Sequence, residues 1–124
     1  ELARTSLDAA RGKLVDILCN YQGYKQCILI LVFDAYKVKG SRGGITDYNN
    51  IHVVYTKEAE TADMYIEKVT HEIGKKHNVT VATSDALEQI IVAGEGAIRM
   101  SAKEFEEEVR RVSERIKEII ENDY

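Results

Sequence analysis

The sequence predicts an α/β protein with three layers, in which helices flank a mainly parallel sheet. This prediction rests on two observations. Segments with the three- and four-residue spacing of amphipathic helices alternate with short apolar segments along the whole chain. The apolar segment at residues 27–33 has no polar residue on either face of the strand that it would form, which is typical of a parallel strand covered on both sides.

The first predicted helix covers residues 5–22, where apolar side chains recur at helical spacing. Thr5 or Ser6 is expected to cap its start, because a hydroxyl can accept a hydrogen bond from the first helical turn. Gly23 is expected to end it, because glycine is common directly after a helix. The apolar strand at residues 27–33 follows.

Residues 35–50 contain three glycines and are predicted to form a flexible loop. Near the end of the chain, Ser101 and Glu104 form the capping box S-A-K-E, which predicts the start of a long last helix. The remaining expected elements are strands at 51–55 and 78–82, a short strand within 94–100, and helices at 61–76, 86–92 and 102–121.

The composition indicates one globular domain over residues 1–124. With 44% hydrophobic and 31% charged residues, the chain can build a core without disulfides. The formal net charge of -4 argues against non-specific coating of nucleic acid, which needs clustered lysine and arginine. The two cysteines lack the spacing of a disulfide framework or a zinc site. No apolar stretch approaches the ~20 residues that cross a membrane, so we expect a cytoplasmic protein with no membrane partner.

Acidic side chains follow three of the predicted strands. Asp34 follows the first strand, Asp85 follows the third, and the second is followed by Glu58, Glu60 and Asp63. Sites in open α/β sheets form beyond the carboxyl ends of the strands, so these acids are expected to share one edge. Carboxylates are the ligands that Mg²⁺ or Mn²⁺ prefers, and such an ion can activate water for phosphodiester hydrolysis. The pattern therefore predicts a metal site.

Each of these acids also suits a local role. Asp34 can start a turn, while Glu60 and Asp63 can complement a helix dipole and Asp85 can do the same for the next helix. Taken singly, the local role is the more frequent one; the convergence of three acids on one edge favours the site.

Basic side chains lie near the first of these acids. Lys37, Lys39 and Arg42 follow Asp34 closely, and basic residues beside an acidic metal site suit a phosphate backbone. A solvated loop is the competing interpretation. The three histidines have no spacing that indicates zinc.

Five segments of the chain resemble the YacP-like NYN domain family. They are V-F-D-A at 32–35, Y-T-K-E-A-E-T-A-D at 55–63, I-E-K at 66–68, V-A-T-S-D at 81–85 and G-A-I-R-M-S-A-K-E at 96–104. The resemblance runs through nearly the whole chain, and the second and fourth segments are fairly specific in combination.

The resemblance implies a PIN-like, Rossmann-like fold and a metal-dependent endoribonuclease that cuts mRNA on a translating ribosome, as a Gram-positive member of the family does. It implies Asp34, Asp63 and Asp85 as catalytic residues and metal ligands, with Glu60 as a further ligand to Mg²⁺ or Mn²⁺. The expected RNA contacts are Lys37, Lys39, Arg42, Lys57, Thr83, Ser84 and Arg99.

The sequence departs from the family in one respect. Members begin with a strand in the middle of the sheet that ends in Asp-Gly-Tyr-Asn, and residue 1 falls after that motif. We therefore expect an N-terminally truncated domain with two unpaired strand edges, which rearranges its sheet or forms a homodimer. Weak metal binding and poor nuclease activity are expected for the same reason.

Two other functions compete with the nuclease. The first is a non-catalytic RNA- or ribosome-binding module on the same fold, because a fold does not fix a function. The second is a receiver-like signalling domain, which would use Asp34 and Thr83 at neighbouring strand ends. Such domains also need an acidic pair and a later lysine, and Arg99 is the only candidate for the latter.

Overall fold

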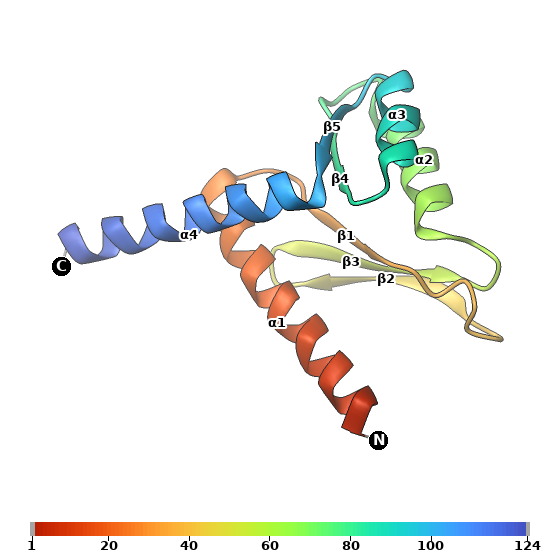
Figure 1. Ribbon diagram of the computed structural model, residues 1–124, viewed down its shortest axis with the longest axis horizontal. Helices are drawn as coiled ribbons and strands as arrows, with labels where there is room; N and C mark the ends of the chain where they lie inside the picture. The colour runs from red at the N-terminus through yellow and green to blue at the C-terminus, as the bar shows by residue number, and fades with distance from the viewer. Residues whose placement is uncertain (1, 124) are drawn as a thin grey trace.

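Four helices and five strands alternate along residues 2–123, which are the residues that the computed structural model describes (Figure 1). In order along the chain they are α1 (Leu2–Lys25), β1 (Ile30–Phe33), β2 (Arg42–Tyr48), β3 (Ile51–Lys57), α2 (Ala62–Ile73), β4 (Thr80–Thr83), α3 (Ala86–Gly94), β5 (Ile98–Ser101) and α4 (Ala102–Asp123). The predicted α/β class and the alternation of its elements are confirmed. No helix in this part of the chain is both long enough and apolar enough to cross a membrane.

The strands form two separate sheets rather than one. The first has the order β1-β3-β2, with β1 parallel and β2 antiparallel to β3, and the second is the parallel pair β4-β5. Figure 1 shows the pair β4-β5 standing apart from the three-stranded sheet. Within the described residues, β1, β2, β4 and β5 therefore each have one edge without a strand partner. The pairing is mainly parallel, as predicted, but the sheet is divided.

Strand β1 is less covered than its sequence predicts. All four of its residues are half-buried rather than buried, and Ile28, which the prediction places within the strand, lies before it and is 69% exposed. The physical reason is that β1 is paired along one edge only, so side chains that a complete sheet would cover remain partly accessible.

Two small cores hold the domain together. In the first, Val15 and Leu18 of α1 pack against Ile51 and Val53 of β3, with Phe105 of α4 at the border. The second core, at the other sheet, is built from Val81, Val92 and Ala97, with Ile66 of α2 packed against it. Helices α1 and α4 thus lie together at one side of the molecule, and α2 and α3 lie together at the other (Figure 1).

The predicted limits of the first helix were wrong. Helix α1 begins at Leu2, before the expected caps Thr5 and Ser6, and it continues through Gly23 to Lys25. The turn that ends it falls on Gln26, which has a left-handed φ of 57° and whose side-chain amide donates to the carbonyl of Gly23 at 2.7 Å. The glutamine thus supplies locally the cap that the prediction assigned to glycine.

The predicted flexible loop contains strand β2. Its residues are all exposed, so the apolar alternation that marks a strand is absent from the sequence. Backbone pairing with β3 holds it instead. Gly43 adopts a φ of +69°, and a Cβ there would lie 3.0 Å from the backbone N of Lys57 and the carbonyl oxygen of Tyr55. At this position the glycine permits close pairing rather than flexibility.

The capping box at the start of α4 is confirmed. The Ser101 hydroxyl accepts from the backbone N–H of Glu104 at 3.0 Å, and the Glu104 carboxylate accepts from the backbone N–H of Ser101 at 2.9 Å. The limits of the other elements differ from the prediction by a few residues; for example, α2 ends at Ile73 instead of residue 76.

Candidate active site

Asp34 lies directly after β1, at its carboxyl end. Its Oδ1 accepts a hydrogen bond from the backbone N–H of Tyr36 at 3.2 Å, so it does start a turn. The next residue, Ala35, donates its N–H to the hydroxyl of Thr56 at 2.8 Å, and Thr56 is fully buried in β3. The turn is thereby fixed to the neighbouring strand, while the Asp34 residue stays exposed and available to a ligand.

Asp63 lies in the first turn of α2, shortly after the end of β3. The helix starts there because the hydroxyl of Thr61 accepts from the backbone N–H of Met64 at 3.1 Å. Burial raises the pKa of Asp63 above its usual value, and the charges of Asp85, Glu67 and Asp34 raise it further. Glu67 lies on the same helix, whereas Asp34 and Asp85 come from two other segments of the chain.

Asp85 follows β4 and caps α3. Its Oδ1 accepts from the backbone N–H groups of Leu87 at 2.9 Å and Glu88 at 3.2 Å. The hydroxyl of Thr83 accepts from the N–H of Asp85 at 3.2 Å, and the carbonyl of Thr83 accepts from the side chain of Gln89 at 3.1 Å. The strand-to-helix turn is therefore rigid, and Asp85 has a local role as well as a place at the edge.

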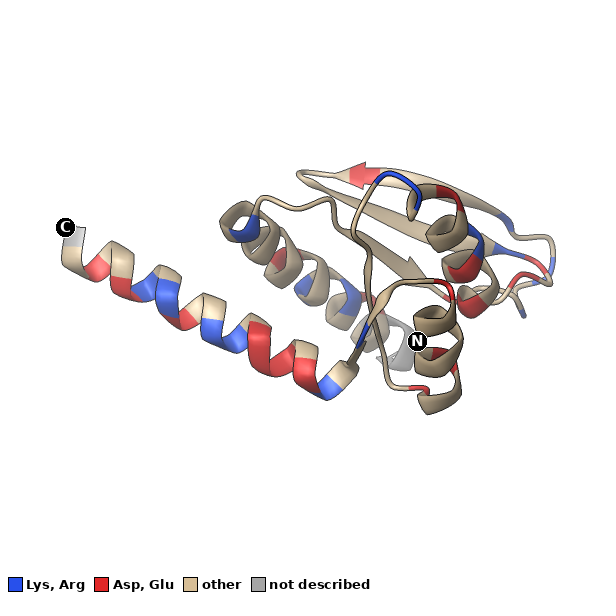
Figure 2. Ribbon diagram, turned by 90° about the horizontal axis from the view of Figure 1, so that it is seen from above, with Lys and Arg blue, Asp and Glu red and all other residues tan. Residues whose placement is uncertain are grey.

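Asp34 and Asp85 both influence the ionisation of Asp63. Both act on it strongly enough to raise its pKa, which like charges do only when they are near. Figure 2 shows acidic segments at the end of the molecule away from the C-terminus, with basic segments beside them, and further acidic and basic segments along α4. The role of these three acids as metal ligands stays a prediction.

Glu60 lies apart from the other three acids. One of its oxygens accepts from the backbone N–H of Lys57 at 3.3 Å, and the other forms an ion pair with Lys68 at 3.4 Å. Its charge is not among those that raise the pKa of Asp63. Lys68 of α2 pairs with Glu60, which lies just before that helix, so this carboxylate already has a partner in the chain.

Sequence reasoning missed two acids, Glu67 and Glu88. Glu88 is only 3% exposed, and its pKa is raised to about 7 by burial, then by a hydrogen bond with Glu67 and by the charges of Asp63, Glu67 and Asp85. Helical spacing could have identified both. Glu67 lies four residues after Asp63 and Glu88 three after Asp85, so each shares a helix face with a predicted site acid.

The carboxylate oxygens are donors of the kind that a hard divalent cation prefers, but too few of them in the described part of the chain surround one position. Within residues 6–122, no group of three or more His, Cys, Asp or Glu side chains is placed to hold a metal ion. However, the carboxylates repel one another, and Oε1 of the buried Glu88 has no hydrogen-bond partner. Mg²⁺ keeps several waters and needs only one or two protein carboxylates. The residues therefore fit such an ion through few direct ligands.

Four of the seven expected RNA contacts lie in the loop after Asp34 and at the adjoining ends of β2 and β3. Lys37 lies over the ring of Tyr36, 5.5 Å from its centre, and Lys39 is in the same loop. Arg42 and Lys57 face each other across β2 and β3. The other expected contacts are Thr83 and Ser84 after β4, and Arg99 in β5, which helps the Ser101 hydrogen bonds lower the pKa of Glu104.

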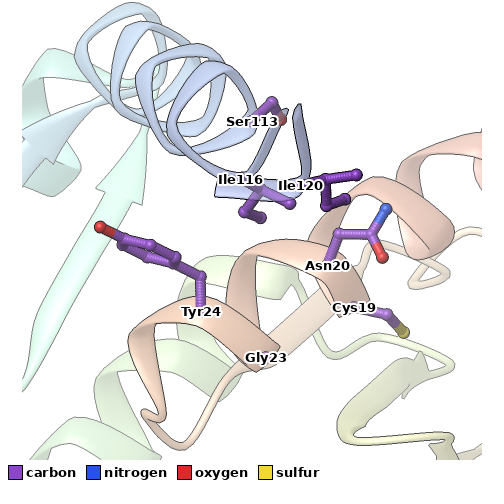
Figure 3. A pocket seen from close by; sticks show the side chains of 7 residues that line it. All are labelled: Cys19, Asn20, Gly23, Tyr24, Ser113, Ile116 and Ile120. Atoms are coloured by element: carbon purple, nitrogen blue, oxygen red, sulfur yellow. The ribbon is translucent and has the colours of Figure 1, made fainter. Parts of the chain in front are cut away.

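An open groove of about 520 Å³ lies elsewhere, between α1 and α4 (Figure 3). It is lined by Cys19, Asn20, Gly23, Tyr24, Ser113, Ile116 and Ile120. No charged side chain lines it, so it offers neither metal ligands nor phosphate contacts. The acidic edge, in contrast, carries carboxylates that can serve as metal ligands and has basic side chains nearby in the sequence.

Comparisons with known proteins agree on the family. The YacP-like NYN domain matches residues 1–124. The chain is 39% identical over 117 residues to the uncharacterized protein YacP of Bacillus subtilis, covering 94% of this chain and 68% of that protein.

Solved structures give the same result. A crystal structure of a point mutant of Rae1 (YacP) from Bacillus subtilis superposes with a TM-score of 0.79 at 36% identity, covering 94% of this chain and 68% of that one. A second Rae1 (YacP) crystal structure gives a TM-score of 0.76 at 37% identity, covering 92% and 66%. The chain therefore belongs to the YacP-like NYN domain family, whose members share a PIN-like nuclease fold.

Proposed function

We propose that this chain is a metal-dependent endoribonuclease domain that cuts mRNA in the cytoplasm, in association with the ribosome. One observation supports the proposal: the charges of Asp85 and Asp34 raise the pKa of Asp63, as expected if acids from three strand ends share one edge. Membership of a PIN-like nuclease family supports hydrolysis of a phosphodiester bond. The mRNA substrate and the ribosome as partner follow from the family resemblance of the sequence.

In the proposed reaction the acidic residues bind the metal and the basic residues bind the phosphate backbone. Asp34, Asp63 and Asp85 would hold Mg²⁺ or Mn²⁺, which when bound supplies an activated water and stabilises negative charge on the phosphate. The turn at Asp34 and the helix cap at Asp85 hold two of these carboxylates in place. The lysines of residues 35–41 hold the phosphate backbone beside them.

A non-catalytic RNA- or ribosome-binding module is the second candidate. It is favoured by the lack, within residues 6–122, of three side chains already placed around one ion position. The basic side chains would bind phosphate in either case, so RNA binding alone does not separate the two functions.

Cleavage of a labelled single-stranded RNA with Mg²⁺ or Mn²⁺ separates them. Asp63→Asn and Asp85→Asn should each lower the cleavage rate by more than about a hundredfold, since even an outer-shell partner of a metal is worth about 10–100-fold. RNA binding should be largely kept. Glu106→Gln, in a surface pair with Arg110 on α4, is the control and should cleave like the wild type.

The outcome that contradicts the nuclease is specific. If wild-type protein binds the RNA but Asp63→Asn and Asp85→Asn change neither cleavage nor metal dependence, then the acidic edge is not catalytic. The binding module would then be the better account.

We further propose that the open edges of β1 and β4 pair with a second copy of the chain. Unpaired strand edges expose backbone N–H and C=O groups that another strand can satisfy. Light scattering coupled to size exclusion should therefore show a dimer that dissociates on dilution. A monomer at every concentration would contradict this proposal.

A further inference from the structure

A second cleft, of about 360 Å³, lies between α1 and the strands β2 and β3 (Figure 1). Each of the two strands contributes one exposed tyrosine to its lining, Tyr48 from β2 and Tyr55 from β3. Between these two rings lie Thr46 and Val53, which pair with each other across the strands. The cleft thus follows the face of the sheet towards the carboxyl end of β3, where Tyr55 lies.

Tyr55 ends a stack of planar side chains. The ring of Phe33, the last residue of β1, stacks on it with 5.3 Å between the ring centres and an angle of 29° between the planes. The guanidinium of Arg11 lies over the Phe33 ring, 5.3 Å from its centre. Because β3 lies between β1 and β2, Phe33 is on one side of Tyr55 and Gly44 is its partner on the other. A Cβ at Gly44 would have no heavy atom within 4 Å, so the space beside the Tyr55 ring is open.

A glycine also keeps the cleft open on the side of α1. Gly12 lines the cleft and lies within the helix, where glycine is less favourable than alanine. A Cβ at Gly12 would have no heavy atom within 4 Å, so the missing side chain avoids no clash. The glycine therefore weakens the helix, and its visible consequence in the structure is a wider cleft.

The open end of the stack lies next to the acidic edge. Phe33 and Tyr55 are paired positions, and Asp34 is the residue directly after Phe33. Lys57 follows Tyr55 by two residues, which places it on the same face of β3, and it pairs with Arg42 of β2. A nucleotide whose base lay against Tyr55 would therefore have these two basic side chains close to its phosphate.

The side chains of the cleft select a planar ligand with polar edges. An aromatic ring with an open side can take any nucleobase, because every base has a π face. Asp8 and Arg11 form an exposed ion pair at 3.8 Å on the α1 side and offer an acceptor and donors to the edge of such a base. An aliphatic ligand would leave both charges without partners. A lone phosphate would meet the carboxylate of Asp8.

We propose that this cleft binds one base of a single-stranded RNA, stacked on Tyr55, and thereby positions the adjoining phosphate at the acidic edge. The inference deepens the proposed nuclease function, from which it takes RNA as the ligand. Free nucleotides present the same base and phosphate chemistry, so the test includes both sources of the base.

The dissociation constant of a short fluorescein-labelled RNA, measured by fluorescence anisotropy with a chelator present, tests the proposal. Tyr55→Leu keeps an apolar side chain and removes the ring, and it should weaken binding by about fivefold to a hundredfold, which corresponds to one lost base–aromatic stack. A ribose-phosphate chain of equal length without bases should bind the wild type and Tyr55→Leu alike. Tyr24→Leu is the control, because Tyr24 is exposed to a similar degree, 43% against 39%, but lies in the groove of Figure 3. It should bind RNA like the wild type.

A second variant separates the loss of stacking from a loss of folding. Gly12→Leu keeps every ring, fills the cleft from α1 and should raise the urea midpoint, since leucine favours a helix. It should nevertheless weaken the base-containing RNA by a similar factor.

Three results overturn the proposal. The first is that Tyr55→Leu or Gly12→Leu binds the base-containing RNA like the wild type. The second is that the wild type does not distinguish this RNA from the chain without bases. The third is that a nucleoside monophosphate displaces the RNA at a concentration near the dissociation constant of the RNA itself, since the cleft would then be a site for free nucleotides.

The same proteins separate this inference from the nuclease function. If the wild type cleaves RNA with metal while both variants bind RNA like the wild type, the inference fails and the function stands. If both variants lose affinity for the base-containing RNA but no protein of the set cleaves it with Mg²⁺ or Mn²⁺, the inference stands and the proposed function fails.

Discussion

Two helix contacts in this molecule each contain a partly or fully buried glutamate, and the two glutamates are treated in opposite ways. Between α1 and α4, Glu108 accepts a short hydrogen bond from the hydroxyl of Tyr21 and pairs with Arg111 at 3.0 Å and Lys25 at 3.9 Å. The Tyr21 hydrogen bond, with these two cations, lowers the pKa of Glu108. Between α2 and α3, the neighbours of Glu88 are acids and its pKa is raised to about 7.

The difference between the two glutamates lies in the charge of their neighbours. Glu108 connects two helices, and Tyr21, Lys25 and Arg111 provide partners for its carboxylate. No ligand is needed there. Glu88 destabilises the chain in the absence of a partner, which natural proteins tolerate mainly at functional sites. The contact between α2 and α3 is therefore the one in which a buried acid among like charges lowers stability.

The largest effect expected from this comparison is a pH dependence that Glu88 causes. The folded-state pKa of about 7 lies above the ordinary 4.5, so between these values the folded chain binds the proton more tightly than the unfolded chain. The contribution of Glu88 to stability should thus be fully present below pH 4.5 and be lost as the pH rises through about 7, by on the order of 2–3 kcal/mol.

Urea unfolding between pH 5 and pH 8 in the presence of a chelator measures this loss. Glu88→Gln should flatten most of the dependence, leaving the smaller part that Asp63 contributes in the same direction. If the free energy of unfolding falls with pH equally in the wild type and in Glu88→Gln, Glu88 does not cause the loss of stability.

The matched change on the other side of the comparison is Tyr21→Phe. It removes the hydroxyl that donates to Glu108 while keeping the edge-to-face packing of the ring on Phe105. The free energy of unfolding should fall by about 1–2 kcal/mol, below the full value of a hydrogen bond to a charged group because Lys25 and Arg111 remain. Urea unfolding at pH 7 gives the value, and an unchanged midpoint would show that the cations alone are sufficient.

The same comparison explains how much of the fold was predictable. Elements with an apolar pattern or a local sequence signal were predicted: the strand before Asp34, the helix that begins at Asp85 and the capping box at Ser101. Strand β2 was missed because it has no buried face, and only its pairing with β3 defines it. The division into two sheets is likewise a property of pairing between distant segments, which no local pattern carries.

The site was predictable to the extent that strand ends mark it. Asp34, Asp63 and Asp85 follow apolar strands, which predicts that they share one edge, and the charges of Asp34 and Asp85 do raise the pKa of Asp63. Glu60 has the same sequence signal, but the ion pair with Lys68 occupies it. Glu88 looked like an ordinary acid in a first helical turn, because burial and the nature of its neighbours are set by the packing of α3 on α2.

The smallest expected effect concerns the junction between the two sides. Helix α4 starts at the end of β5 and runs to α1, so its first turn connects the second sheet to the α1–α4 contact. Ser101→Ala removes the hydroxyl that caps this turn and should lower the free energy of unfolding by about 0.5–1 kcal/mol. Ser113→Ala, within the same helix and in the groove of Figure 3, is the control. It should leave stability equal or slightly higher, since alanine favours a helix interior. Equal effects of the two changes would mean that the cap contributes nothing, and that packing alone holds α4 between the two sides.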